Sequence, residues 1–417
     1  MKEKILIISP YLPYDNVGHA GGKVIYDFIA HLKKRNVRVY LISLVTPDEI
    51  SELEDLKSLC DDTCFLIFEP LFSTGFMKLF LRSPLSAIFK LPFALICHFM
   101  IRWKLAHHSQ RLVNRYDPDI IQVEYSMMAI YLSEIRSTKL RVLNLHDVML
   151  KPLERLYEAE KNFLRRGLRF LLFLFVKRRE ISFCRQFDKI LVKSEFDKQL
   201  LLKQGNFEIE IFPLGIETVS RIEPYENREP NSILFVGALY NDLNERAVLY
   251  FIKEVLPKLK QNLGFVKFYV VGSSPSQGLK KMSSESVIIK GFVDDLSLFY
   301  NRCGVFVAPL FVGGGMILKI LQAMSYGLPV VSSTIANEGI LAKDNEEILL
   351  ADSAEDFCHK TGLILRDKEL WQRISNGGRS FVNCRYSWDI VLDDYLRLFN
   401  QGILAKAEVR KGLTAFF

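Results

Sequence analysis

Lys319 and the three glycines before it are the residues of this sequence whose types and spacing best suit the binding of a phosphate group. Gly313, Gly314 and Gly315 follow an apolar run and precede a helix-forming stretch. Glycines just before a helix leave backbone N–H groups uncovered at the positive end of its dipole, where anions bind. Lys319 follows within one helical turn, so its ammonium could reach a second phosphate oxygen. A tight turn beside a solvated lysine is the alternative interpretation.

The residues around Lys319 resemble the donor-binding segment of group 1 (GT4-type) retaining glycosyltransferases of the GT-B fold, in the subgroup that carries three consecutive glycines. The matching residues are Pro309-Leu310, Gly313 to Gly315, Lys319, Ala323-Met324 and Gly327-Leu-Pro-Val-Val331. The resemblance implies that the glycines and Lys319 hold the diphosphate of a nucleotide sugar. It also implies that Gln322, at the position of a family glutamate, holds the ribose.

Other motifs extend the resemblance over about residues 230–395, in the order that the family shows. They are Phe235-Val-Gly237, Asn244 to Ala247, Val270-Val-Gly272, Gly291-Phe-Val-Asp-Asp295, Glu338-Gly339 and Ser387-Trp388-Asp389. By this resemblance Gly237 and Glu338 join the donor-binding residues. In the first half of the chain, Gly21 and Gly22 resemble the family's paired glycines that face the donor diphosphate, and an ordinary loop pair is the alternative.

His146 follows an apolar strand at residues 141–145, and a histidine near this place contacts the donor sugar close to the reacting centre in the resembling family. We therefore expect His146 and Lys319 to be the catalytic residues. Asp147 could orient the imidazole ring, and we expect it, with Glu124, on the acceptor side. Glu124, after another short strand, could accept a hydrogen bond from an acceptor hydroxyl, or could be an exposed loop carboxylate.

The alternation of strands and helices predicts an α/β protein with two Rossmann-like, doubly wound domains that face each other across a cleft. We expect an acceptor domain at residues 1–214, a donor domain at 215–395, and a C-terminal helix at 396–417 that packs back toward the first domain. A polar, proline-bounded stretch at 217–230 predicts the linker.

The net charge of +7 arises within the first half of the chain, where residues 71–116 and 161–179 hold basic and large apolar residues but no acidic ones. Such segments suit an anionic membrane surface, and the alternative is that they bury their apolar residues internally. The sequence carries no recognised nucleic-acid module. The seven cysteines are scattered, which predicts a reducing cytoplasm without zinc or disulfides. We therefore expect a cytoplasmic protein, peripheral on the inner face of the membrane.

The resemblance implies an enzyme that transfers a sugar from a nucleotide diphosphate sugar to a lipid-linked or polysaccharide acceptor, with retention and with no metal or other cofactor. Two residues depart from the family pattern: Gln322 replaces a glutamate, and Ile317 stands where an arginine is common. These departures keep an alternative open, in which the chain is a non-catalytic GT-B partner in a polysaccharide assembly complex.

Overall fold

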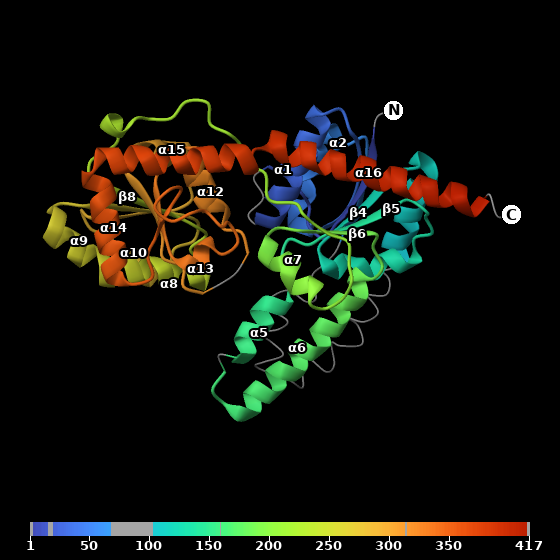
Figure 1. The fold of residues 1–417 in the computed structure, drawn as a ribbon, viewed down its shortest axis with the longest axis horizontal. Coiled ribbons are helices and arrows are strands. Elements are labelled where there is room, and N and C mark those ends of the chain that lie inside the picture. The colour runs from blue at the N-terminus through green and yellow to red at the C-terminus, as the bar shows by residue number, and fades with distance from the viewer. Residues whose placement is uncertain (1–2, 16–19, 68–102, 159, 313–314, 415–417) are drawn as a thin grey trace. The chain divides into compact units, whose positions relative to one another are not determined.

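The computed structural model describes residues 3–15, 20–67, 103–158, 160–312 and 315–414 (Figure 1). The chain forms two compact units. Unit 1 comprises residues 1–192, 197–212 and 392–417, and unit 2 comprises residues 193–196 and 213–391. Helix α16 (Trp388–Thr414) therefore begins in unit 2 and continues into unit 1.

Unit 1 is built on a seven-stranded sheet with the order β3-β2-β1-β4-β5-β6-β7, and every pairing in it is parallel. The elements of this half of the chain are β1 (Lys4–Ser9), α1 (Ala20–Lys34), β2 (Arg38–Val45), η1 (Pro47–Glu52), α2 (Leu53–Leu59), β3 (Asp62–Ile67), β4 (Ile120–Glu124), η2 (Ser126–Glu134), β5 (Leu140–Asn144), α5 (Leu150–Glu158), α6 (Phe163–Cys184), β6 (Lys189–Val192), α7 (Glu195–Leu202) and β7 (Ile209–Ile211). A further helix runs through residues 103–116.

Unit 2 repeats this plan with a six-stranded parallel sheet of order β10-β9-β8-β11-β12-β13. Its elements are η3 (Tyr225–Asn227), β8 (Ser232–Val236), α8 (Asp242–Tyr250), the π-helical η4 (Phe251–Val255), α9 (Leu256–Leu263), β9 (Lys267–Val271), α10 (Gln277–Lys280), β10 (Val287–Lys290), α11 (Ser297–Arg302), β11 (Val305–Ala308), α12 (Leu318–Ser325), β12 (Val330–Ser332), α13 (Thr334–Asn337), β13 (Leu349–Leu350), α14 (Ala354–Arg366) and α15 (Lys368–Arg385).

The prediction of two Rossmann-like domains with parallel sheets is confirmed. The central strands are continuous apolar runs because helices cover both of their faces, and β1 and β8 are buried along nearly their whole length. In each sheet the order in which strands are added reverses beside the first strand. In unit 1, β4 lies on the opposite side of β1 from β2, and in unit 2, β11 lies on the opposite side of β8 from β9. Ligands of such sheets bind at the carboxyl ends of the strands at this point.

Helices α5 and α6 lie side by side as a hairpin that extends away from the sheet of unit 1 (Figure 1). None of the described helices combines the length and the apolar content that are needed to cross a membrane. Helix α16 is anchored in unit 1 by aromatic packing, because Tyr395 lies against Phe28 and Phe212 with ring centres 4.9 and 5.0 Å apart.

Candidate active site

A buried carboxylate, Glu124, lies at the carboxyl end of β4 and organises the polar residues around it. Asn144 is its register partner on β5 and donates a hydrogen bond to Glu124 Oε2 at 2.8 Å. Gln122, two residues earlier on the same face of β4, donates to Glu124 Oε1 at 2.6 Å. His146 Nε2 lies 2.6 Å from Glu124 Oε2. All three partners therefore hold Glu124 in one place.

The interpretation of Glu124 as an exposed loop carboxylate is wrong, because Glu124 is the last residue of a central strand and is fully buried. Glu124 also lies against the His146 ring, a contact that the sequence did not suggest. Asp147 is exposed, and its negative charge adds to burial in raising the pKa of Tyr11.

Tyr125 covers the ring of His146. The two rings stack with centres 4.3 Å apart and an interplanar angle of 13°, and Tyr11 meets Tyr125 edge-on at 5.2 Å. Tyr125 has a φ of 65°, which is strained for a bulky residue and is typical of functional sites. A Cβ added at Gly21 would lie 2.4 Å from the Tyr125 hydroxyl, so a larger residue there would displace the Tyr125 side chain.

Gly21 and Gly22 lie in the first turn of α1, which begins at Ala20. Helix α1 follows β1, so these glycines belong to the same edge of the sheet as His146. Unit 1 thus brings together Gly21, Tyr125 and His146, and Glu124 supports them from within the sheet.

In unit 2, the ammonium of Lys319 is enclosed although the residue as a whole keeps some exposure. Its Nζ donates a hydrogen bond to Asn244 Oδ1 at 2.7 Å and lies 4.6 Å from the centre of the Phe235 ring. Asn244 in turn donates to the Ala238 carbonyl at 2.9 Å, which fixes the amide oxygen toward the lysine. Burial of the ammonium lowers the pKa of Lys319 to about 7.

Because Gly237 has no side chain, the space beside it is open to the ammonium of Lys319. A Cβ at this position would lie 2.8 Å from Lys319 Nζ and 3.0 Å from Asn244 Cγ. Lys319 is the second residue of α12, which begins at Leu318, so the helix starts later than the sequence suggested and the ammonium lies close to its N-terminus. Three features that favour an anion therefore coincide: a helix N-terminus, a flexible amine and a side-chain-free approach.

The glycine turn before α12 packs against the segment that carries Glu338. Gly315 has a φ of 83°, and a Cβ added at Gly339 would lie 2.4 Å from the Gly315 carbonyl oxygen. Glu338, which precedes Gly339, is half-buried beside this turn. Gly313 and Gly314 lie outside the described residues.

Gln322 lies one turn beyond Lys319 on α12 and is half-buried. Its Oε1 accepts a hydrogen bond of 3.4 Å from the hydroxyl of Tyr300, whose ring stacks on Tyr326 at 5.1 Å. Ile317, just before the helix, packs against the hydrophobic core of unit 2. At the position where an arginine is common in the resembling family, this chain thus has an apolar contact.

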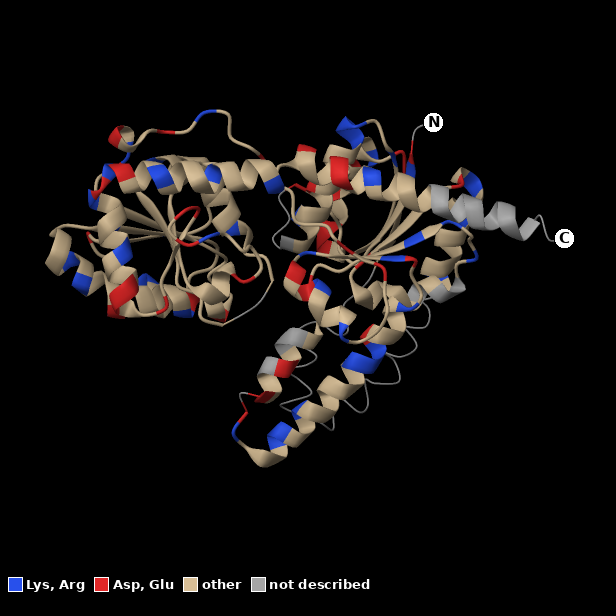
Figure 2. Ribbon diagram, in the orientation of Figure 1, with Lys and Arg blue, Asp and Glu red and all other residues tan. Residues whose placement is uncertain are grey.

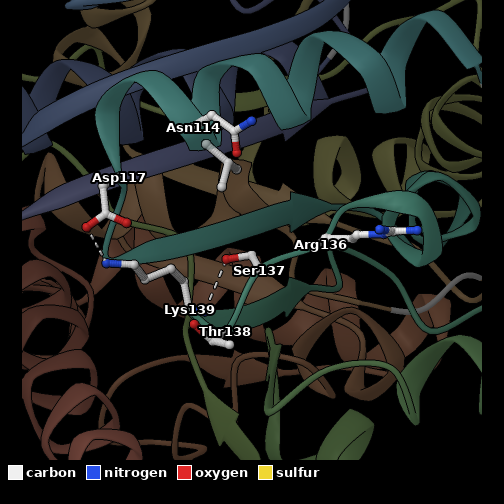
Figure 3. Close-up of a pocket in the computed structure, with 7 residues that line it drawn as sticks. Asn114, Asp117, Arg136, Ser137, Thr138 and Lys139 are labelled. Atoms are coloured by element: carbon white, nitrogen blue, oxygen red, sulfur yellow. Dashed lines mark hydrogen bonds and ion pairs between the residues drawn. The ribbon is translucent and has the colours of Figure 1, made fainter.

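A surface pocket of about 520 Å³ lies elsewhere on unit 1, between the helix at residues 103–116 and the loop before β5 (Figure 3). Its lining includes Asp117 and Lys139, which form an ion pair at 2.8 Å. Both residues precede strands β4 and β5, so the pocket lies at the amino ends of the strands, opposite the edge that holds His146. Its position argues against a catalytic role.

Two family models match the chain. The model described as Glycosyltransferase Family 4 matches residues 21–219, and the model described as Glycosyl transferases group 1 matches residues 230–367. The chain belongs to the group 1, family 4 glycosyltransferases. The first model covers the residues around His146, and the second covers the residues around Lys319.

The chain is 24% identical over 262 residues to an uncharacterized 44.6 kDa protein in the cps region of Klebsiella pneumoniae, over 60% of this chain and 65% of that one. It spans about half to two thirds of the length of the curated relatives that it matches.

Among the solved structures that share the fold of this chain, two illustrate the likeness. Sucrose-phosphate synthase from Thermosynechococcus elongatus has a TM-score of 0.71 at 17% identity, covering 97% of this chain and 100% of that one. Anabaena HepE in complex with UDP-glucose has a TM-score of 0.60 at 14% identity, covering 97% and 99%. At these identities the likeness establishes the GT-B fold alone.

Several roles of polar residues in the candidate site were not predicted from the sequence. Gln122 and Glu124 alternate within an otherwise apolar strand, and two polar residues on one face of a buried strand are a signal that could have marked them as a bonded pair. Asn244 belongs to one of the motifs that resemble the family, but no role for its side chain was predicted from the sequence. Tyr395 gave no signal, because its partner is far away in the sequence.

Proposed function

We propose that this glycosyltransferase moves a sugar from a nucleotide diphosphate sugar to a lipid-linked or polysaccharide acceptor, with retention at the anomeric carbon and without a metal ion. The observation that carries this proposal is the enclosed ammonium of Lys319 at the start of α12, beside the turn that ends in Gly315. The complex of HepE, a protein of the same fold, with UDP-glucose supports a nucleotide diphosphate sugar as the donor.

In this proposal, unit 2 binds the donor and stabilises its leaving group. Lys319 and the N–H groups at the start of α12 supply positive charge to the diphosphate as it departs, which is the work that a metal ion performs in other enzymes. Gly313 to Gly315 allow the backbone to approach the phosphates, and Gly237 keeps the space beside the ammonium open. Gln322 and Glu338 hold the nucleoside and the sugar.

By the family resemblance, Gly21 and Gly22 serve the diphosphate and His146 serves the donor sugar. In the reaction, the bond between the anomeric carbon and the diphosphate oxygen breaks. The acceptor oxygen bonds to the same face of that carbon, and its proton passes to the departing phosphate oxygen. Asp147, exposed beside His146, is available to the acceptor.

We further propose that α6 carries the enzyme on an anionic membrane surface. Its exposed apolar side chains include Phe163 and Leu164, with exposed fractions of 85% and 79%. Lys and Arg residues occur along the same helix, as the blue segments of its ribbon show (Figure 2). Exposed apolar and basic residues on one helix favour the interface of an anionic bilayer, at about 1 kcal/mol for each cation near the surface. This arrangement supports a lipid-linked acceptor. Most of the other segment predicted to meet the membrane, 71–116, lies outside the described residues.

Two residues favour a second candidate function, a non-catalytic partner in polysaccharide assembly. Gln322 offers the ribose a neutral amide, and Ile317 provides no cation. Loss of a charged hydrogen bond costs about 1.5–3 kcal/mol, which would weaken donor binding by about tenfold or more.

Calorimetric titration with UDP-, GDP-, ADP- and dTDP-sugars tests the proposal. We expect one nucleotide to bind, and Lys319→Ala to weaken that binding by about 10- to 100-fold, because a charge-assisted bond to phosphate is lost. Lys253→Ala, which removes an exposed lysine of the same unit, is the matched control and leaves the affinity unchanged. Failure of all four donors to bind would favour the non-catalytic partner.

A further inference from the structure

A chain of buried hydrogen bonds connects helix α16 to His146. The Tyr395 hydroxyl donates to Gln122 Oε1 at 2.5 Å, and Gln122 Nε2 donates to Glu124 Oε1 at 2.6 Å. The other oxygen, Glu124 Oε2, accepts a hydrogen bond from the Asn144 amide at 2.8 Å and lies 2.6 Å from His146 Nε2. Tyr395, Gln122 and Glu124 are almost completely buried, so the chain is screened from water.

Each bond of this chain specifies the direction of the next. A carboxylate accepts only, so Gln122 must turn its NH₂ group toward Glu124 and its oxygen toward Tyr395. The phenol of Tyr395 must then donate to that oxygen. At the other end, Nε2 of His146 must carry a proton, and Nδ1 is the ring atom that gains or loses the second one.

The charge of Glu124 also bears on His146. Within the described part of the chain, the only ion pair of Glu124 is the one with His146. A buried carboxylate without a cation is unfavourable, so Glu124 favours the positively charged form of the imidazole. Among the described residues, the titratable groups near the ring include the phenols of Tyr125 and Tyr11 and the carboxylate of Asp147.

We propose that Glu124 is a positioning residue that keeps the proton of His146 on Nε2 and favours its imidazolium, and that Tyr395 and Gln122 hold Glu124 in the position this requires. This inference rests on the proposed function, in which His146 meets the donor sugar. In this proposal Glu124 hydrogen-bonds His146 and does not bind an acceptor hydroxyl. Through Tyr395 it also makes the orientation of His146 depend on α16, the helix that continues from the donor unit.

Nuclear magnetic resonance of the free protein, with histidines labelled with ¹⁵N, tests this proposal. The spectrum of His146→Gln identifies the signals of His146. In the parent protein we expect the neutral ring to show the Nε2-protonated tautomer. Glu124→Gln lowers the pH at which the ring becomes neutral by about one unit or more, because an adjacent negative charge is removed. Tyr395→Phe produces a smaller change in the same direction.

Tyr386→Phe is the matched control, since Tyr386 is a buried tyrosine of unit 2 whose hydroxyl donates a single hydrogen bond of 3.1 Å to the Ile340 carbonyl. It leaves the His146 signals unchanged. The proposal is overturned if Glu124→Gln and Tyr395→Phe alter only the unfolding temperature and leave the tautomer and titration of His146 as in the parent.

Donor transfer by the same variants separates this proposal from the proposed function. Where the parent transfers sugar, the pH profile of kcat/KM is expected to shift with the His146 titration. A parent without transfer whose His146 signals still shift would refute the proposed function and leave the positioning role standing. Transfer with an unmoved histidine titration would refute the positioning role alone.

Discussion

Raising the pH should weaken donor binding, because Lys319 must be protonated to hold a diphosphate. Without a ligand, burial lowers the pKa of this lysine to about 7, whereas an adjacent diphosphate favours the ammonium form and raises the pKa in the complex. A group whose pKa rises on binding contributes its full interaction below the pKa of the free protein. That contribution is lost as the pH rises above it.

The size of the effect follows from the fraction of protonated lysine in the free protein. With a pKa of about 7, most of the protein is protonated at pH 6 and only a few per cent is protonated at pH 8.5. Each pH unit above 7 corresponds to about a tenfold loss of affinity, so the dissociation constant should rise about 30-fold between pH 6 and 8.5. Near pH 8, donor binding should take up about 0.9 proton.

Isothermal titration calorimetry measures both quantities when the experiment is repeated in two buffers of different ionisation enthalpy. The nucleotide sugar is a suitable ligand because its phosphates are diesters that stay ionised over this range. Lys319→Met, which keeps the buried stem without the amine, is expected to bind the donor weakly and with no dependence on pH. A dissociation constant that stays flat from pH 6 to 8.5, with no proton uptake, would refute the assignment of Lys319.

Three further predictions concern other parts of the molecule. Gly237→Ala should weaken donor binding by tenfold or more in calorimetry, because its Cβ would displace Lys319 Nζ; Gly278→Ala, whose Cβ meets only Ser276 Oγ at 3.6 Å, should have no effect. Burial raises the pKa of Glu180 to about 7, so Glu180 destabilises the fold as the pH rises from its unfolded value of about 4.5 toward 7. Glu180→Gln should therefore increase the free energy of unfolding at pH 8 by up to about 3 kcal/mol and change it little at pH 4.5, as denaturant titrations at both pH values would show. Phe163→Ser with Leu164→Ser should reduce sedimentation with anionic vesicles by tenfold or more, whereas Phe265→Ser, an exposed residue of unit 2, should not. Equal vesicle binding by both variants would contradict a role of α6 at the membrane.

The fold was predictable from sequence because the central strands are apolar runs bounded by turns. Strands β1, β8 and β11 are mostly apolar runs of this kind. The helical stretch after β8 is divided by a π-helical turn before Pro257, which lacks the N–H needed to continue the helical bonds. Short edge strands such as β13 were missed, since two residues carry too little pattern.

The candidate site was predictable only where local pattern determines it. Lys319 and its glycines could be recognised because a strand, a glycine turn and a helix follow one another in sequence. Glu124 was misjudged because its burial depends on β1 and β5, which flank β4 in the sheet. Tyr395 and Gln122 are 273 residues apart in the sequence, and no local rule joins them.

The fate of the anomeric carbon tests the proposed function most directly. Hydrolysis of the bound donor needs no acceptor other than water, and proton magnetic resonance shows which anomer of the sugar appears before it equilibrates. With excess EDTA present, we predict slow release of nucleoside diphosphate and a first-formed sugar with the configuration of the donor, both reduced by Lys319→Ala. A first-formed sugar of inverted configuration, or no release from any of the four donors, would contradict the proposal of metal-independent transfer with retention.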